Sequence, residues 1–381
     1  MVRLDRATLI GAIALLLLTA VYQAKGNVEL IAGTERSSAV DLLNRHNEQR
    51  HFHRGENPFD VMPGSQPPWG YAFGALLTWP EWPAVRIYFA ALNALALGFL
   101  MWFAYRESHG APRPSRLLMM GGVAAFGGSC TATEVGQISI ICTALLAGAL
   151  VADRSDRPWL SGVLVALAMI KPTIAAPFAV VLVLTRRTAA VVAAGLYGIA
   201  ASLLSWTITG ASPLHMLRQL NEVAATHIGD GTIGLADTLA AIGASPASVA
   251  LTPLIIAVPA AALVLWTRAS LPTAFAIAAV WGRTWTYHKS YDDVMLAFLL
   301  ISLGLHAFAR SRSGPAFVAF VIIGVLEWLP GRLLALPAVQ IMQLMAWPAA
   351  LMLLLRLESH PSPTWQWGIP RGTAARDHAA I

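Results

Sequence analysis

Residues Asp41–Pro68 read DLLNRHNEQRHFHRGENPFDVMPGSQPP, a polar stretch in a chain that is otherwise mostly apolar. Carboxylates, arginines and histidines crowd this stretch, whereas the whole chain is 56% hydrophobic and only 12% charged. A soluble domain of this length carries about twice that charged fraction. The contrast predicts that the stretch lies outside a membrane in which the remainder of the chain is embedded.

Apolar runs close to the roughly 20 residues that cross a bilayer recur on both sides of this stretch. Only helices and closed barrels satisfy the backbone in lipid, and no segment alternates like a barrel strand. The mean hydropathy of +0.61 fits the all-α polytopic membrane protein that these runs predict. We expect about 12 spans, at residues 7–24, 84–105, 117–133, 137–152, 158–170, 173–185, 188–209, 246–267, 271–282, 292–309, 314–329 and 338–355.

The basic residues predict the orientation of these spans. With the N-terminus inside, the inner breaks hold fifteen of the 26 Lys and Arg residues but only six of the 20 Asp and Glu residues. The positive-inside rule then gives cytoplasmic N- and C-termini in the cell (inner) membrane, with Asp41–Pro68 extracytoplasmic. The basic balance therefore reflects topology, and no nucleic-acid partner is expected.

The same pattern predicts the domain organisation. Residues 1–357 form one integral membrane domain with an outer loop at 25–83, and residues 358–381 form a disordered cytoplasmic tail. The run at 7–24 is long for a signal peptide and lacks a good cleavage site, so we expect a retained helix. Cys130 and Cys142 are too few for a disulfide framework and are expected to be small buried residues.

Two outer segments are predicted to form helices on the membrane surface. In the first, Ser38–His53, one face collects Ala39, Leu42, Leu43 and His46, while Arg45, Glu48 and Gln49 point elsewhere. The second, Gly210–Leu235, opens with Ser212-Pro213, a favourable N-cap and first helical position.

A short hairpin places a cation within the apolar region. The runs 158–170 and 173–185 would each rise about 20 Å, short of the roughly 30 Å of a hydrocarbon core, and they meet at Lys171-Pro172. A charge at that depth is costly unless it faces a water-filled cavity or an anion. The alternative is that Lys171 reaches the interface by snorkelling.

Asp41 is the candidate general base, because a carboxylate at a helix N-terminus stays ionised and could accept a hydroxyl proton. The alternative is structural, since Ser38-Ala39-Val40-Asp41 is a capping-box pattern. Glu48, Glu56 and Asp60 are competing carboxylates. The spacing of His46, His51 and His53 does not fit a helical zinc motif, so neither a metal nor a cofactor is expected.

Outer cations indicate an anionic partner such as a phosphate in the headgroup layer. The positive-inside rule disfavours basic residues on that side, and pairing with Glu48, Asp292 and Asp293 is the alternative explanation. The residues concerned are Arg45, Arg50, Arg54, Lys171, Arg283, His288 and Lys289.

Four motifs in this order resemble glycosyltransferase family 87, multi-spanning enzymes of the glycosyltransferase-C superfamily. The first is Asp41 followed by Gly55-Glu56-Asn57-Pro58-Phe59-Asp60, and the second is Pro67-Pro68. The third is Gly136-Gln137 with a later Lys171-Pro172. The fourth collects Arg283, Trp285, Tyr287, His288, Tyr291 and Asp292. Two positions depart from the family pattern. Gln66 stands where an aromatic residue usually precedes the Pro-Pro pair, and Phe59 replaces the commoner tyrosine. These departures leave the sugar and the acceptor undetermined.

The resemblance implies a glycosyltransferase-C-like helical bundle that transfers a hexose, here expected to be mannose, from a polyprenyl-phosphate donor. The acceptor would be a lipid or a glycan, and the transfer would invert the anomeric centre. It also implies that Asp41 is the catalytic base. The expected donor-binding residues are Lys171, His288, Arg283, Arg45, Gln137 and Tyr287.

Two other classes of function are weighed against this one. A flippase or transporter of lipid-linked sugars would favour ionisable residues near the midplane and internal repeats, whereas the charges gather at the outer face and no repeat is found. A membrane scaffold would explain neither Lys171 nor the residues around His288.

Overall fold

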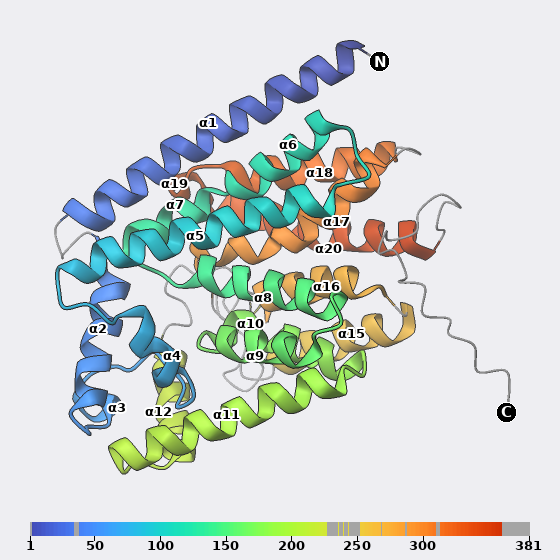
Figure 1. The fold of residues 1–381 in the computed structure, drawn as a ribbon. Coiled ribbons are helices and arrows are strands. Elements are labelled where there is room, and N and C mark those ends of the chain that lie inside the picture. Colours follow the sequence, from blue (N-terminus) through green and yellow to red (C-terminus); the bar gives the residue numbers. More distant parts are fainter. Residues whose placement is uncertain are drawn as a thin grey trace, which may run out of the picture.

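The computed structural model describes residues 2–33, 38–226, 252–267, 269–285, 288–309 and 313–359, with single positions 235, 239 and 243. Within these ranges every regular element is a helix (Figure 1), so the predicted all-α class is confirmed. The elements are α1 (Val2–Ala32), α2 (Val40–His53), α3 (Pro58–Val61), α4 (Gly70–Leu77), α5 (Ala84–Glu107), α6 (Arg113–Ala124), α7 (Gly127–Val135), α8 (Ser139–Arg154), α9 (Pro158–Ala168), α10 (Pro172–Leu184), α11 (Thr188–Thr209), α12 (Pro213–Thr226), α15 (Thr252–Thr267), α16 (Leu271–Thr284), the 3-10 helix η1 (Ser290–Leu296), α17 (Ala297–Phe308), α18 (Gly314–Trp328), α19 (Gly331–Leu334) and α20 (Pro337–Ser359).

Among the described residues, five helical segments are long and apolar enough to cross a membrane. They are Arg6–Ala32 of α1, α5, α11, the η1–α17 segment and α20. The α7–α8 pair makes a sixth if it counts as one span, although its halves are bent by 118°. The chain is therefore a multi-pass helical membrane protein. The count of about 12 crossings stays a prediction, because α9, α10, α15 and α18 are shorter apolar helices.

Most predicted spans coincide with helices, and α11 begins and ends at the predicted residues 188 and 209. The predicted span 117–133 is instead two helices, α6 and α7, that separate at Ala125 and Phe126. A side chain on Gly127 or Gly128 would collide with the backbone carbonyls of Leu329 and Ser290. These glycines let α7 approach the backbone of two other segments directly.

Helix α1 extends to Ala32, beyond the predicted end at residue 24. Arg86 of α5 donates from Nε to the carbonyl of Leu30 at 2.5 Å and from Nη2 to that of Gly33 at 2.7 Å. A cation on the last carbonyls of a helix satisfies their hydrogen bonds and favours the helix dipole. Arg86 therefore stabilises the end of α1 from which the chain continues toward α2.

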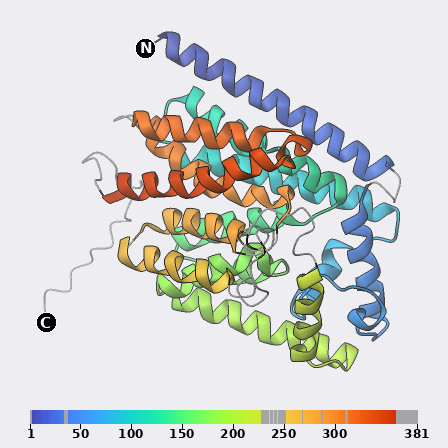
Figure 2. The same cartoon turned by 180° about the vertical axis from the view of Figure 1, so that it is seen from behind.

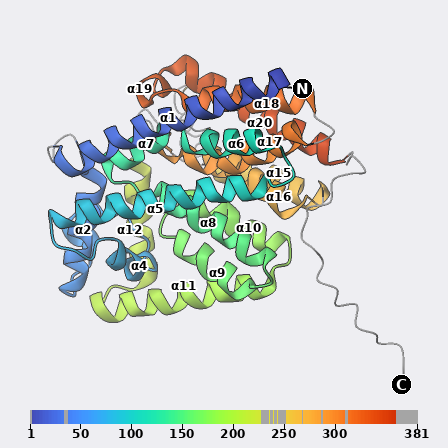
Figure 3. The same cartoon turned by 45° about the horizontal axis from the view of Figure 1, so that its top comes forward.

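The helices run between two ends of the bundle. Helices α2, α3, α4 and α12 gather at one end, here called the α2 end, and the N-terminal end of α1 and the C-terminal end of α20 lie at the other (Figures 1 and 2). Helices α1 and α11 lie on opposite sides, with α5, α8 and α9 between them (Figure 3). Cys130 and Cys142 are buried free thiols, as predicted.

Both helices expected at the membrane surface are present, and their position relative to a bilayer stays a prediction. Ser212 caps α12 as expected, since its Oγ accepts from the backbone N–H of His215 at 3.3 Å. The predicted orientation of α2 was wrong in one respect, because Arg45, Glu48 and Gln49 are buried together with Leu42. These polar side chains can be buried because neighbouring segments supply hydrogen-bond partners for them.

Candidate functional site

The first turn of α2 places Asp41 against the α7–α8 break. Ala39 precedes the helix in a left-handed conformation with φ of 57°, and its N–H donates to the carbonyl of Glu134 at 2.9 Å. The half-buried carboxylate of Asp41 accepts from Gln137 Nε2 at 2.9 Å. The capping-box alternative does not describe this contact, because the partner of Asp41 lies on another helix pair.

Gln137 connects Asp41 to Arg45. Its Oε1 accepts from Arg45 Nη2 at 3.1 Å and from the backbone N–H of Ile138 at 3.0 Å, while its Nε2 is used by Asp41. The preceding Gly136 has φ of 73°, and a Cβ there would collide with Leu42 of α2. A glycine at this position thus permits the close approach that brings Gln137 to Asp41.

Two residues further on, Ser139 opens α8 and belongs to a second cluster of polar side chains. Ser139 Oγ donates to Asp292 Oδ1 at 2.5 Å, and Lys171 Nζ lies 3.0 Å from Ser139 Oγ and 2.5 Å from Asp292 Oδ1. His288 Nδ1 lies 2.8 Å from the other carboxylate oxygen of Asp292. The segment 137–139 therefore links Asp41 and Arg45 on one side to Lys171 and His288 on the other.

Two tryptophans hold the turn that carries Lys171. Trp69 Nε1 donates to the carbonyl of Met169 at 2.9 Å, and Trp285 Nε1 donates to the carbonyl of Thr173 at 2.9 Å. The ammonium of Lys171 also lies 4.8 Å from the centre of the Tyr291 ring, within cation–π range. Segments before α4, after α16 and in η1 thus converge on the tip of the α9–α10 hairpin.

The two remaining predicted donor-binding residues are Arg283 and Tyr287. Arg283 is completely buried, forms an ion pair with Asp293 and has its guanidinium 5.1 Å from the Trp347 ring centre. Its charge is therefore already balanced in the interior. Tyr287 lies outside the described residues.

Arg45 is a buried predicted cation with unused hydrogen-bonding capacity. It is 6% exposed, and its Nε and Nη1 are buried with no hydrogen-bond partner among the described residues. Buried donors of a guanidinium are costly to leave unpaired. An anion next to Gln137 would satisfy them.

The competing carboxylates have other partners. Glu48 is fully buried and accepts from the Ser65 N–H at 3.0 Å, Ser65 Oγ at 2.7 Å and Gln66 Nε2 at 3.2 Å. Burial raises the pKa of Glu48 above 4.5, an effect that the Arg45 charge and these hydrogen bonds only partly offset. Glu56 contacts His51 at 2.5 Å, and Asp60 accepts from Asn57 and Gln219, each at 3.0 Å.

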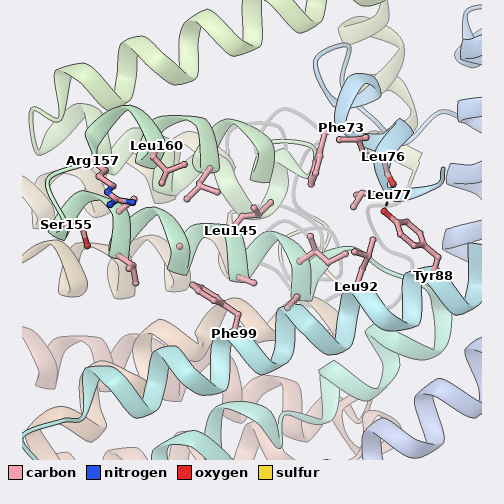
Figure 4. Close-up of a pocket in the computed structure, with 17 residues that line it drawn as sticks. Phe73, Leu76, Leu77, Tyr88, Leu92, Phe99, Leu145, Ser155, Arg157 and Leu160 are labelled. Carbon is pink, nitrogen blue, oxygen red and sulfur yellow. Dashed lines mark hydrogen bonds between the residues drawn. The ribbon is translucent and has the colours of Figure 1, made fainter. Parts of the chain in front are cut away.

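The bundle also contains an apolar groove of about 700 Å³. It runs between α5 on one side and α8 and α9 on the other, with α4 closing one end (Figure 4). Phe73, Leu77 and Tyr88 lie at the α2 end of the groove, and Ser155 and Arg157 lie at the opposite end. Ile141, in the first turn of α8 that also holds Ser139, is part of its lining.

The model of glycosyltransferase family 87 matches residues 66–286, more than half of the chain. The chain belongs to glycosyltransferase family 87. The resemblance seen in the sequence is thereby confirmed, and family membership implies that the protein is a membrane glycosyltransferase. No curated protein and no solved structure matches the chain.

The family match and the site geometry overlap in part. The matched residues 66–286 include Gln137, Lys171 and Arg283, whereas Asp41, Arg45 and His288 lie outside that range. The structure brings Asp41, Gln137 and Arg45 into one cluster and Lys171 and His288 into the next. Sequence reasoning missed Ser139. It named Asp292 in the fourth motif and as a pairing alternative but gave it no role in the site, although the four-residue spacing from His288 was a usable signal.

Proposed function

We propose that this family 87 enzyme transfers a hexose, mannose in the first instance, from a polyprenyl phosphate to a lipid or glycan acceptor with inversion. The observation that carries the proposal is the segment 137–139, whose side chains contact the Asp41–Arg45 cluster through Gln137 and the Lys171–His288 cluster through Ser139. A carboxylate and a group of cations are thus held on either side of one short turn. A sugar phosphate between them would meet a base at one end and positive charge at the other.

In the proposed reaction Asp41 takes the proton of an acceptor hydroxyl as that oxygen attacks the anomeric carbon. Among the described residues one side chain, Gln137, donates to the half-buried carboxylate, so lone pairs remain for the hydroxyl. The bond between the anomeric carbon and the phosphate oxygen breaks, and the phosphate leaves as an anion. A positioned general base contributes about 10²- to 10⁴-fold to such a step.

Arg45 is the cation that we assign first to the phosphate. Its unpaired Nε and Nη1 lie beside Gln137, whereas Lys171 is bonded to Asp292. Guanidinium groups bind phosphate oxygens in pairs, which stabilises the charge that develops on the leaving group. Lys171 and His288 would then contact the phosphate from the opposite side of the turn.

The apolar groove is the proposed site of the polyprenyl chain. It runs from Phe73 and Tyr88 at the α2 end toward Arg157, between α5 and α9, so a hydrocarbon chain bound there would lie along the spans (Figure 4). Together with the positive-inside pattern, this favours an extracytoplasmic active site in the cell membrane with cytoplasmic termini. The short helices α9, α10, α15 and α18 complete the proposed set of about 12 crossings.

The proposal is tested with purified protein, radiolabelled polyprenyl-phosphate mannose and a lipid extract. Formation of a labelled product that no longer carries the polyprenyl phosphate is the expected result. Movement of label across a vesicle membrane without product would favour a transporter. Neither product nor movement, with the corresponding glucose donor also inactive, would contradict a polyprenyl-phosphate hexose as donor.

A further inference from the structure

His288 and Asp292 form a dyad with a defined hydrogen position. The Asp292 carboxylate only accepts in its ion pair with Lys171, so the hydrogen in the 2.8 Å contact belongs to His288 Nδ1. The other ring nitrogen, Nε2, is buried and has no hydrogen-bond partner among the described residues. Such a nitrogen costs free energy unless a ligand pairs with it, so Nε2 points to a group that is not part of the described chain.

The charges around His288 balance before any ligand arrives. Lys171 is paired with Asp292 at 2.5 Å, and Arg283 is paired with Asp293. Burial lowers the pKa of His288 below 6.5, which leaves the ring neutral at pH 7 even though Asp292 partly offsets the effect. A phosphate anion entering this cluster would bring a negative charge that Lys171 and Arg283, each already paired, do not offset. Arg45, across the 137–139 turn, would be its one unpaired cation among the described groups assigned to the phosphate.

We propose that Asp292 is a positioning residue that turns His288 Nε2 toward the donor phosphate and stabilises the imidazolium when donor binding draws one proton onto Nε2. The inference rests on the proposed function, because the phosphate is that of the polyprenyl donor. In the bound state Nε2–H donates to a phosphate oxygen and Nδ1–H donates to Asp292. The proton comes from solvent and returns to it when the phosphate leaves.

The described groups that face His288 leave its Nε2 free to take a proton. Lys171 comes from the α9–α10 turn, Asp292 and Asp293 from η1, and Arg283 from α16, and each belongs to an ion pair. Ser139 of α8 is neutral, the neighbouring Lys289 is exposed, and Glu327 of α18 accepts from Trp347 and Gln343. Protonating His288 therefore adds a positive charge without breaking any of these pairs.

The experiment measures proton uptake by titration calorimetry at pH 7 in buffers of different ionisation enthalpy. The probe is polyprenyl-phosphate mannose without acceptor, a phosphodiester whose own charge is constant near neutral pH. The wild-type protein should take up close to one proton per donor bound. Asp292→Asn should bind donor with uptake near zero, because Lys171, released from its ion pair, then balances the phosphate together with Arg45, and its turnover should fall about 100-fold while donor affinity changes little.

A second pair of variants distinguishes a specific loss of proton uptake from misfolding. His288→Gln should also bind donor without proton uptake, whereas the matched control His53→Gln, which changes an exposed histidine of α2, should keep the wild-type value. Wild-type binding without proton uptake, or unchanged uptake in Asp292→Asn, would overturn the role of Asp292 and leave the proposed reaction standing. Absence of probe binding to the wild-type protein would instead overturn the donor assignment.

Discussion

The two halves of α2 carry the same kinds of side chain in different surroundings. In the first half, Asp41 is half-buried and, within the described part of the chain, receives one side-chain hydrogen bond, from Gln137. In the second half, Glu48 is fully buried and receives three, from Ser65 and Gln66. The difference shows that one carboxylate retains capacity for a substrate, whereas the other is committed to holding the loop that leads into α4.

The largest expected effect comes from Asp41→Asn. The amide keeps the size of the side chain and can still pair with Gln137, but it cannot take a proton from the acceptor. We expect turnover to fall by about 10²- to 10⁴-fold, with donor binding nearly unchanged, in an assay of labelled sugar transfer.

The matched control for this variant is Asp60→Asn, which changes an exposed aspartate in the same segment. It should retain transfer within a few-fold of wild type. If Asp41→Asn transferred sugar as fast as Asp60→Asn, another residue would have to be the general base. The different surroundings of Asp41 and Glu48 would then have no bearing on catalysis.

Gly136→Ala should have the next largest effect. The added Cβ would collide with Leu42, and the backbone would have to hold a non-glycine residue at φ of 73°. Moving α2 away by about 1 Å would separate Asp41 from Gln137, and misplacement on that scale can cost about 100-fold in rate. Gly98→Ala, where a Cβ meets open space within α5, should leave transfer unchanged, and equal activity of the two variants would contradict the account.

Arg45→Gln tests whether Arg45, which contacts Gln137 beside Asp41, binds the donor phosphate. Charge-assisted hydrogen bonds contribute about 1.5–3 kcal/mol, so losing the guanidinium should raise the KM for donor by roughly 10- to 100-fold. Arg54→Gln, at an exposed position just beyond α2, serves as the control. A donor KM that is the same in both variants would remove Arg45 from the phosphate site.

Glu48→Gln should have the smallest effect on activity and a distinct effect on stability. Because burial raises the pKa of Glu48, the folded protein holds this proton more tightly than the unfolded chain does. The free energy of unfolding should therefore fall as pH rises from about 4.5 through the raised pKa, and Glu48→Gln should flatten that dependence. Thermal unfolding in detergent across this pH range measures it, and an unchanged pH dependence would show that Glu48 does not titrate as its burial implies.

Much of the helical layout follows from local sequence. The apolar runs and polar breaks predicted both ends of helix α11 at the observed residues. The Ser212-Pro213 pair predicted the N-cap of α12. The division of the predicted span 117–133 into α6 and α7 depends on close contacts of Gly127 and Gly128 with distant backbone, which local hydropathy does not contain. The extension of α1 depends in the same way on Arg86, a residue of another helix.

The sequence indicated which residues gather at the site, but it did not indicate which of them contact one another. Sequence reasoning selected Asp41, Arg45, Gln137, Lys171 and His288, and the structure gathers them around one turn, although their roles stay predictions. It could not separate Asp41 from Glu48, because both are acidic residues on one helix and differ only in what covers them. Nor could it see that Lys171 shares Asp292 with His288, since Lys171 belongs to a distant segment of the chain.

The central claim is that Asp41 and the cations across the 137–139 turn enclose the donor's sugar. A cryo-EM structure of the Asp41→Asn variant with intact polyprenyl-phosphate mannose tests it most directly. The account predicts the anomeric carbon facing the side chain at position 41, the phosphate on Arg45 and His288, and the hydrocarbon chain in the groove beside Ile141. A phosphate bound at the opposite end of the groove, at Arg157, with position 41 remote from the sugar, would contradict it.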